Sequence, residues 1–172
     1  MLNLGTARRT IVMAAATLAV AGGTIIDVGG AAHAAPAGCT PNIINIGAPG
    51  SIYVGSEYAG QVEQQYDSCG SARAHFQYSY SYWVNHRGDS LPSNWSANPC
   101  LMPQGFAAPP CNYSETILGP QDAYTDWVPI HNSNPDTWQA TVNISLACGA
   151  GYGSWHAYAS GANWGNSDAG PC

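Results

Sequence analysis

The chain of 172 residues contains no lysine and only four arginines, and charged residues make up 8% of it. Two of these arginines, Arg8 and Arg9, lie in an N-terminal segment that we expect to be removed. The remaining chain then has two arginines against nine acidic residues, a net charge of −7. Affinity for nucleic acids depends mainly on Lys and Arg, and so does attraction to anionic lipids. The composition therefore predicts neither a nucleic-acid partner nor membrane insertion after cleavage.

Several common metal and catalytic motifs are also absent. No C-x-x-C pair occurs, which argues against zinc or iron–sulfur sites built on cysteine. The sequence has no G-x-S-x-G elbow of a serine hydrolase. Four histidines in the later chain lack the close spacing of a metal motif: His75, His86, His131 and His156. We therefore predict no catalytic residue, no metal and no cofactor.

The N-terminus has the three parts of a secretory signal peptide. Arg8 and Arg9 give a positive start, an apolar run spans residues 11–26, and Ala32-His33-Ala34 has small residues at the two positions that a signal peptidase recognises. A membrane anchor needs about 20 consecutive apolar residues, and glycines and an aspartate interrupt this run. We therefore expect cleavage after Ala34.

This segment also bounds the domain and its compartment. The paired arginines partly resemble a twin-arginine signal, so both bacterial export routes stay open. The alanine-rich leader is typical of bacteria. Residues 1–34 are thus predicted to be a signal peptide, and residues 35–172 a single secreted, extracellular domain.

Six cysteines all lie in the predicted mature domain: Cys39, Cys69, Cys100, Cys111, Cys148 and Cys172. An even number of cysteines in a small exported domain predicts a disulfide framework. Sequence alone cannot choose among the pairings. Proximity along the chain favours three bridges: Cys39 with Cys69, Cys100 with Cys111, and Cys148 with Cys172.

Alternation of polar and apolar residues with a period of two dominates the domain and predicts strands. The clearest run covers residues 138–148, and a glycine-rich turn joins it to a second run over residues 154–160, as in a hairpin. Weaker strands are expected at 43–46, 51–54, 57–66 and 124–130. Residues 91–120, rich in Pro, Ala, Asn and Gly, are expected to form one long loop. The pattern predicts an all-β fold, an antiparallel β-sandwich of six to eight strands with three disulfides.

One alternating run is strongly aromatic and places Phe76, Tyr78, Tyr80 and Tyr82 on a single strand face. Such a face could stack against sugar rings. Tyrosine could equally bury its ring while its hydroxyl reaches water, so both interpretations stay open. Because of the first, Tyr78, Tyr80 and Tyr82 are candidate binding residues.

Two tryptophans, Trp95 and Trp164, lie in predicted loops between polar or small neighbours. Exposure of so large an apolar ring in a loop needs a reason, and ligand binding is one. The same rings could cap the ends of the sandwich. Trp95 and Trp164 join the three tyrosines as candidate binding residues.

Three classes of function remain. The first is a secreted, non-enzymatic interaction domain that binds a protein, as an inhibitor or as an adaptor or subunit of an exported complex such as an antibacterial toxin assembly. Residues 43–46 would then be a donated strand or an ordinary edge strand. The second is a carbohydrate- or cell-wall-binding module that uses the aromatic strand face. The third is a secreted hydrolase, or a copper monooxygenase if cleavage made His33 the N-terminus.

Overall fold

A computed structural model describes residues 39–87, 96–105, 111, 115–130, 136–144, 150–166 and 168. Contacts divide the chain into two units, Met1–Gly30 and Ala31–Cys172, and every described residue belongs to the second. The predicted signal peptide lies outside the described residues, and so do Trp95, Cys148 and Cys172.

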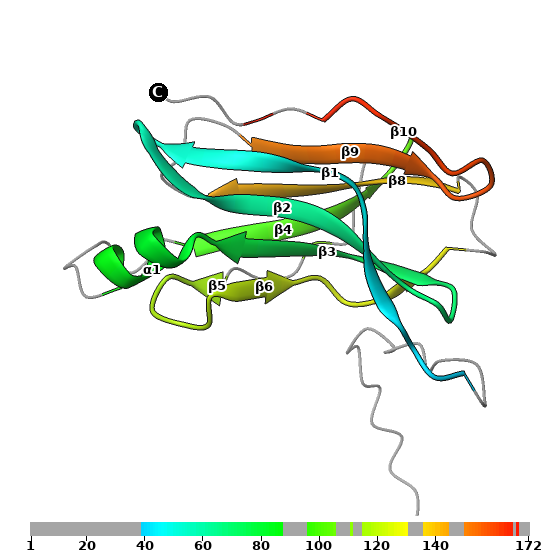
Figure 1. Ribbon diagram of the computed structural model, residues 1–172, viewed down its shortest axis with the longest axis horizontal. Helices are drawn as coiled ribbons and strands as arrows, with labels where there is room; N and C mark the ends of the chain where they lie inside the picture. The colour runs from blue at the N-terminus through cyan, green and yellow to red at the C-terminus, as the bar shows by residue number, and fades with distance from the viewer. Residues whose placement is uncertain are drawn as a thin grey trace, which may run out of the picture. The chain divides into compact units, whose positions relative to one another are not determined.

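Two antiparallel β-sheets make up most of the described chain (Figure 1). The first has the strand order β1-β2-β3-β6, with β7 also paired to β3. Its strands are β1 (Ile43–Val54), β2 (Glu57–Asp67), β3 (Ser71–Tyr78), β6 (Asp122–Tyr124) and β7 (Val128–Pro129). A single helix of the described residues, α1 (Tyr80–His86), follows β3.

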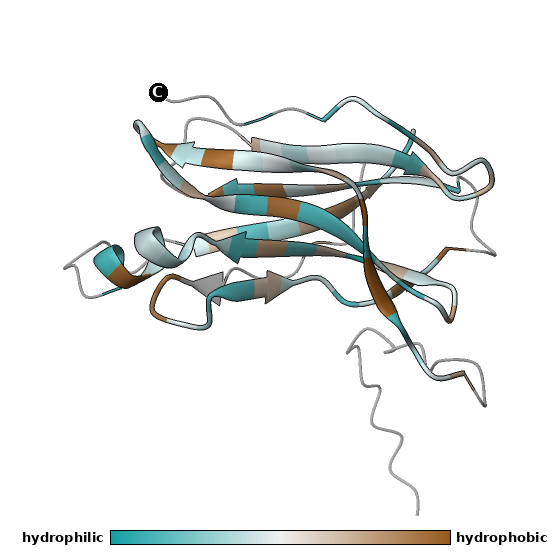
Figure 2. Ribbon diagram, viewed as in Figure 1, coloured by the Kyte–Doolittle hydropathy of each residue, from teal (hydrophilic) through white to brown (hydrophobic). Residues whose placement is uncertain are grey.

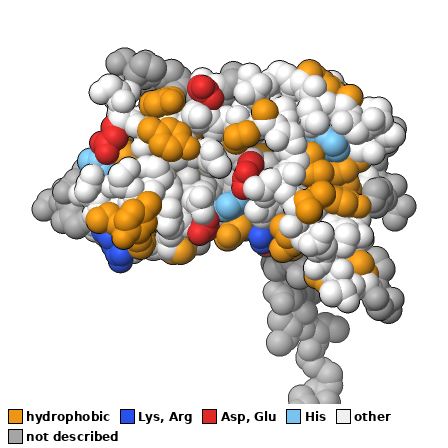
Figure 3. All heavy atoms as spheres, in the orientation of Figure 1, with side chains coloured by type: hydrophobic (Ala, Val, Ile, Leu, Met, Phe, Trp, Pro, Cys, Tyr) orange, Lys and Arg blue, Asp and Glu red, His pale blue; other side chains and the backbone are white. Residues whose placement is uncertain are grey.

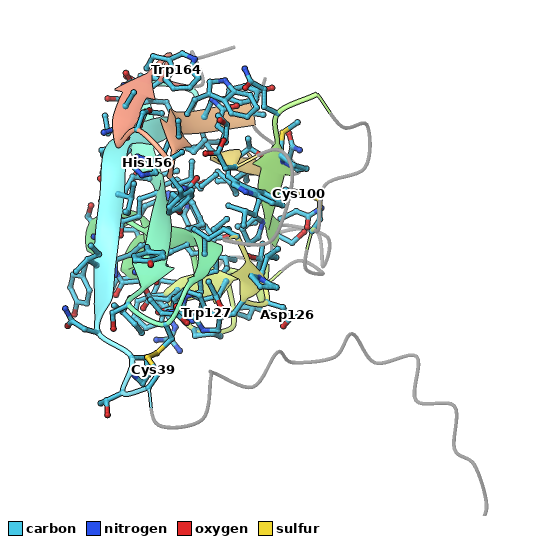
Figure 4. The ribbon with its side chains drawn as sticks, turned by 90° about the vertical axis from the view of Figure 1, so that its right-hand side faces the viewer. Cys39, Cys100, Asp126, Trp127, His156 and Trp164 are labelled. Carbon is cyan, nitrogen blue, oxygen red and sulfur yellow. A yellow bond between two sulfur atoms is a disulfide. The ribbon has the colours of Figure 1, made fainter. Side chains whose placement is uncertain are left out.

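The second sheet has the order β10-β9-β8-β4-β5. Its strands are β4 (Ser96–Pro103), β5 (Glu115–Thr116), β8 (Thr137–Ile144), β9 (Ala150–Ala157) and β10 (Ala162–Trp164). The two sheets pack together, which Figure 4 shows from their ends. The prediction of two packed antiparallel sheets is confirmed, but the described residues form ten strands rather than six to eight.

The apolar core lies between the sheets. Alternate residues of β3 and β8 are buried in it: Ala72, Ala74, Phe76 and Tyr78, and Trp138, Ala140, Val142 and Ile144. Figure 2 shows the same alternation as teal and brown bands along β2 and β3. Burial of a Val, Leu, Ile or Phe side chain contributes about 1.5–3 kcal/mol each. The period-two pattern of the sequence thus reflects one buried and one outer face for each sheet.

Strands β1 and β9 belong to different sheets and approach closely through glycines. A Cβ atom at Gly50 would collide with the backbone of Tyr152, and one at Gly151 would collide with the Ile52 side chain. The Ala48 amide also donates to Ser154 Oγ at 2.9 Å. From Gly47 onward, β1 is therefore packed against the second sheet.

Two disulfides link the described cysteines, Cys39–Cys69 and Cys100–Cys111. Both match the pairings that proximity favours, while the third predicted pair lies outside the described residues. Disulfides persist in oxidising compartments, so these bonds indicate an oxidising setting. Among the described helices, none is both long and apolar enough to cross a membrane.

The prediction that residues 91–120 form one long loop is wrong, because β4 lies within them, next to β8. Pro99 and Pro103 concealed this strand, since proline cannot donate to a sheet ladder and normally marks an edge or an end. Here β4 pairs with β8 along its length, but with β5 only at Ser96 and Ala97. The prolines lie beyond that short pairing, where the second side of β4 has no described strand partner.

The prediction that Tyr78, Tyr80 and Tyr82 share one strand face is also wrong. Strand β3 ends at Tyr78, and α1 begins at Tyr80. Ser79 caps this helix, since its Oγ accepts from the Tyr82 amide at 3.2 Å, and serine is a preferred N-cap residue. Tyr78 and Tyr82 lie in the core, so neither offers a surface for a ligand, and Tyr80 faces solvent. Tyr occurs at every second position on both sides of the change from strand to helix. The period-two pattern therefore does not show where the strand ends.

Candidate functional site

Of the two most exposed large apolar side chains of the described residues, one lies in α1 and the other lies beside it. Tyr80 is 69% exposed and Leu118, in the turn after β5, is 64% exposed; Val84 is 43% exposed. Trp83 joins them, because its Nε1 donates to the Gly119 carbonyl at 3.2 Å and so ties the turn to the helix. We name Tyr80, Trp83, Val84 and Leu118 the apolar patch. Figure 3 shows hydrophobic side chains gathered over this end of the molecule.

The local sequence explains why the helix presents this patch. Tyr80, Trp83 and Val84 are spaced i, i+3 and i+4, so they lie on one helix face. Tyr82 points the other way, into the core, where its ring stacks on Tyr78 with centroids 6.3 Å apart. One buried tyrosine therefore anchors the helix and leaves its apolar face toward solvent.

Contacts within the patch hold the aromatic rings in place. The Arg87 guanidinium lies 4.2 Å from the centroid of the Trp83 ring, a cation–π geometry. The Tyr80 and Trp83 rings lie 6.3 Å apart at an angle of 46°. Tyr, Trp and Arg are the residues most enriched at the energetic centres of protein interfaces. The patch thus combines preordered aromatic rings with accessible apolar surface.

A second group of side chains, which we name the charged cluster, lies on the outer face of the first sheet: Glu63, Arg73, His75, Asp122 and Tyr124. The His75 ring is between two carboxylates. Its Nδ1 lies 2.9 Å from Glu63 Oε1, and its Nε2 lies 2.8 Å from Asp122 Oδ1. Strands β2, β3 and β6 supply these three residues. We take His75 to donate from both ring nitrogens, because a carboxylate oxygen accepts at each; Gln65 Nε2, 3.1 Å from Nδ1, is then a close neighbour and not a donor to it.

The electrostatics of the charged cluster favour the imidazolium form. Burial alone would lower the pKa of His75, but its hydrogen bonds with Glu63 and Asp122 outweigh burial and raise the pKa above the ordinary value of 6.5. Both nitrogens are occupied by carboxylates, so neither is available to exchange a proton with a substrate. This geometry argues against His75 as a general acid or base.

Stacking completes the charged cluster. The Arg73 guanidinium lies 3.9 Å from the Tyr124 ring centroid and 4.4 Å from that of Trp127. The His75 ring stacks on Tyr124 with centroids 4.7 Å apart and 9° between the planes. The Tyr124 ring is therefore already engaged by two neighbouring side chains, although 37% of the residue is exposed.

The structure separates the residues predicted to bind a ligand. Tyr80 lies in the apolar patch, and Tyr78 and Tyr82 lie beneath it in the core. Trp164, in β10, is 42% exposed and pairs in register with Trp155. Figure 4 shows Trp164 well apart from Trp127, which flanks the charged cluster. Trp95 lies outside the described residues.

Sequence reasoning missed most members of both groups. The i, i+3, i+4 spacing of Tyr80, Trp83 and Val84 after a serine cap was a usable signal for a helix. No comparable signal marked the charged cluster, because 47 residues separate His75 from Asp122. Only the order of the strands brings them together.

The geometry limits what the charged cluster can hold. In the part of the chain that the structure describes, no group of three or more His, Cys, Asp or Glu could hold a metal ion. In the charged cluster the imidazole separates the two carboxylates, so they cannot share a cation beside it. Compared with protein-family models, curated proteins and solved structures, the chain matches none.

Proposed function

We propose that the mature domain is a secreted, non-enzymatic interaction domain that binds another protein through the apolar patch. The observation that carries this proposal is the exposure of Tyr80, Val84 and Leu118 around the anchored ring of Trp83. Apolar surface gathered in this way commonly marks a site of protein association.

The energetics support a protein partner. Removing apolar surface from water stabilises a complex by about 25 cal/mol per Å². Ordering a flexible side chain on binding opposes association by about 0.5–1.5 kcal/mol. Trp83 is already held by the Gly119 carbonyl and by Arg87, so less of this entropy remains to be lost. An anchored aromatic ring within exposed apolar residues is the composition expected of an interface centre.

A second candidate function, a carbohydrate- or cell-wall-binding module, is supported by Trp164. Its ring is partly exposed beside Trp155 at the β10 edge of the second sheet. The aromatic strand face on which this hypothesis first depended does not exist. The face of the charged cluster does not replace it, since the Tyr124 ring already stacks with the Arg73 guanidinium and the His75 ring.

The test is affinity purification of the tagged domain from its native culture fluid, with mass spectrometry of what it retains. Wild type is compared with Tyr80→Ser and Leu118→Ser, and with Trp164→Ser as the matched control for loss of an exposed ring. We expect one protein partner to be retained by wild type and Trp164→Ser and lost from both patch variants.

The opposite pattern would overturn the proposal. If Trp164→Ser loses the partner and both patch variants keep it, the patch is not the interface. Retention of wild type, but not Trp164→Ser, on chitin, cellulose or peptidoglycan would instead support the carbohydrate-binding candidate.

A further inference from the structure

Among the described residues, no strand pairs with the outer edge of the first half of β1. Strand β1 lies at the end of the first sheet and pairs only with β2 among the described strands. From Gly47 onward it is packed against β9 and β10, because Gly47 approaches Ser154 and Asn163 and the Ala48 amide donates to Ser154. Ile43–Ile46 precede this contact: Ile43 and Ile44 are each 47% exposed, Asn45 is exposed and Ile46 is half-buried.

This edge is held in strand conformation rather than frayed. The Cys39–Cys69 disulfide ties the chain just before β1 to the turn between β2 and β3. The Asn42 amide donates to Ser68 Oγ at 3.0 Å, and the Ser68 amide donates to the Asn42 carbonyl at 3.1 Å. A preordered edge loses little conformational entropy when it pairs with another strand.

The edge also lacks charged residues, one of the usual protections against association, and the irregularity of β1 at Pro49 lies beyond it, between Ile46 and Gly50. Natural edge strands carry charged residues, especially lysine, which prevent pairing with another chain. This chain has no lysine, and no charged residue occurs from Cys39 to Ser56. Two copies with a strong negative charge can therefore approach here without placing like charges opposite one another.

The sequence of the edge is self-complementary. Ile44-Asn45-Ile46 is the same in both directions. An antiparallel pairing about a two-fold axis at Asn45 places each Ile44 opposite Ile46 of the second copy and the two Asn45 residues opposite each other. Ile44 and Ile46 share a sheet face with Tyr66 and Gln64. Apolar side chains would thus meet on one face and amides on the other.

We propose that Ile43–Ile46 pairs with the same segment of a second copy, so that the first sheets of two domains join edge to edge in a two-fold symmetric dimer. Isologous contacts of this kind use one surface twice. The paired segment has four residues, whereas a standard stable interface uses roughly 20–30 residues a side. The dimer is therefore weak and depends on protein concentration.

The first test is sedimentation equilibrium of the full mature domain over a wide range of concentrations. We expect self-association with a dissociation constant on the order of 100 μM, as for a small contact. Ile44→Asp should weaken it at least tenfold. Val84→Asp is the matched control, since Val84 is 43% exposed and the charge change is identical; it should leave association unchanged.

The control also separates this proposal from the proposed function. If Val84→Asp abolishes self-association and Ile44→Asp does not, the copies associate through the apolar patch and the edge proposal is wrong. Self-association that is absent from wild type throughout this range overturns the edge proposal and leaves binding of another protein intact.

A second measurement tests the register and does not depend on the folding of Ile44→Asp. Residues directly opposite in an antiparallel pair have Cα atoms about 4.5–5.5 Å apart, which a disulfide can span. Asn45→Cys should therefore form a covalent dimer under mild oxidation at least tenfold faster than Ser160→Cys, a control in the exposed turn after β9. Equal rates would overturn the proposed axis at Asn45.

Discussion

The charged cluster and the apolar patch differ in whether their side chains have interaction partners within the domain. In the charged cluster, His75 meets two carboxylates and Arg73 meets two aromatic rings. In the apolar patch, the indole N–H of Trp83 has a partner, while the apolar surfaces of Tyr80 and Leu118 face water. The first group stabilises the domain by itself, whereas the second gains most when another molecule covers it. The two therefore predict opposite responses to mutation.

The largest effect on stability is expected from His75→Ala. The change leaves Glu63 and Asp122 without the cation between them, and removal of one partner from a buried ion pair costs about 3–5 kcal/mol. Because Asp122 is partly exposed, we expect a loss of about 3 kcal/mol in the free energy of unfolding. Urea unfolding followed by tryptophan fluorescence, with the disulfides intact, measures it. A loss below about 1 kcal/mol would show that the charged cluster is not a stabilising unit.

The apolar patch should behave in the reverse way. Tyr80→Ser and Leu118→Ser alter exposed side chains, so the free energy of unfolding should change by less than about 0.5 kcal/mol. Affinity for a captured partner should fall by about 2 kcal/mol, as for an interface centre, which is roughly 30-fold. Titration calorimetry with that partner gives the affinity, and urea unfolding gives the stability. Equal losses in affinity and in the free energy of unfolding would mean that the apolar patch stabilises the domain as the charged cluster does.

The alternation of polar and apolar residues was sufficient to predict two packed antiparallel sheets. It was not sufficient to locate every strand or the helix. It predicts β8 and β9 as a hairpin because one face of each strand is buried and the other is polar. It fails at β4, where two prolines resemble a loop, and at α1, where Tyr and Ser alternate across a change from strand to helix. Two of the bridges followed from short separations along the chain, a local property.

The candidate sites were harder to predict because they depend on packing. Tyr80 was named as a binding residue for a strand face that does not exist, and its exposure instead results from the helix that Ser79 caps. Glu63, His75 and Asp122 lie on separate strands, and only the order β2-β3-β6 brings them together. Sequence periodicity indicates which face a residue occupies but not which strand lies beside it.

A smaller effect is expected from pH. The folded-state pKa of His75 is raised above 6.5, so its stabilising contribution is fully present below about pH 6.5 and is lost as the pH rises through the folded-state pKa. The charged and titratable groups beside the ring are Glu63 on β2 and Asp122 and Tyr124 on β6, with Arg73 on the same strand; the Gln65 amide of β2 also lies 3.1 Å from Nδ1. Urea unfolding between about pH 6 and pH 9 should show stability falling in wild type and a smaller fall in His75→Gln. If the free energy of unfolding falls equally with pH in wild type and His75→Gln, the assignment of His75 as an imidazolium that donates to both carboxylates is wrong.

The smallest single effect, that of Glu57→Gln, belongs to the sharpest comparison, in which one substitution is made at two histidine–glutamate contacts. His75 with Glu63 and His86 with Glu57 both have N···O distances of 2.9 Å, but the Glu63 side chain is 12% exposed and that of Glu57 is 46% exposed. Solvent weakens exposed ion pairs, which contribute about 0.2–1 kcal/mol, whereas hydrogen bonds to buried charges contribute about 1.5–3 kcal/mol.

Glu57→Gln should therefore lower the free energy of unfolding by about 0.5 kcal/mol or less, and molar salt should abolish the difference. Glu63→Gln should lower it by about 2 kcal/mol, with little dependence on salt. Urea unfolding of both variants at low and high salt makes the comparison. Since the distance and the substitution are the same, a difference between the two sites isolates burial as the cause. Equal losses would mean that solvent reaches the charged cluster as freely as it reaches the end of α1.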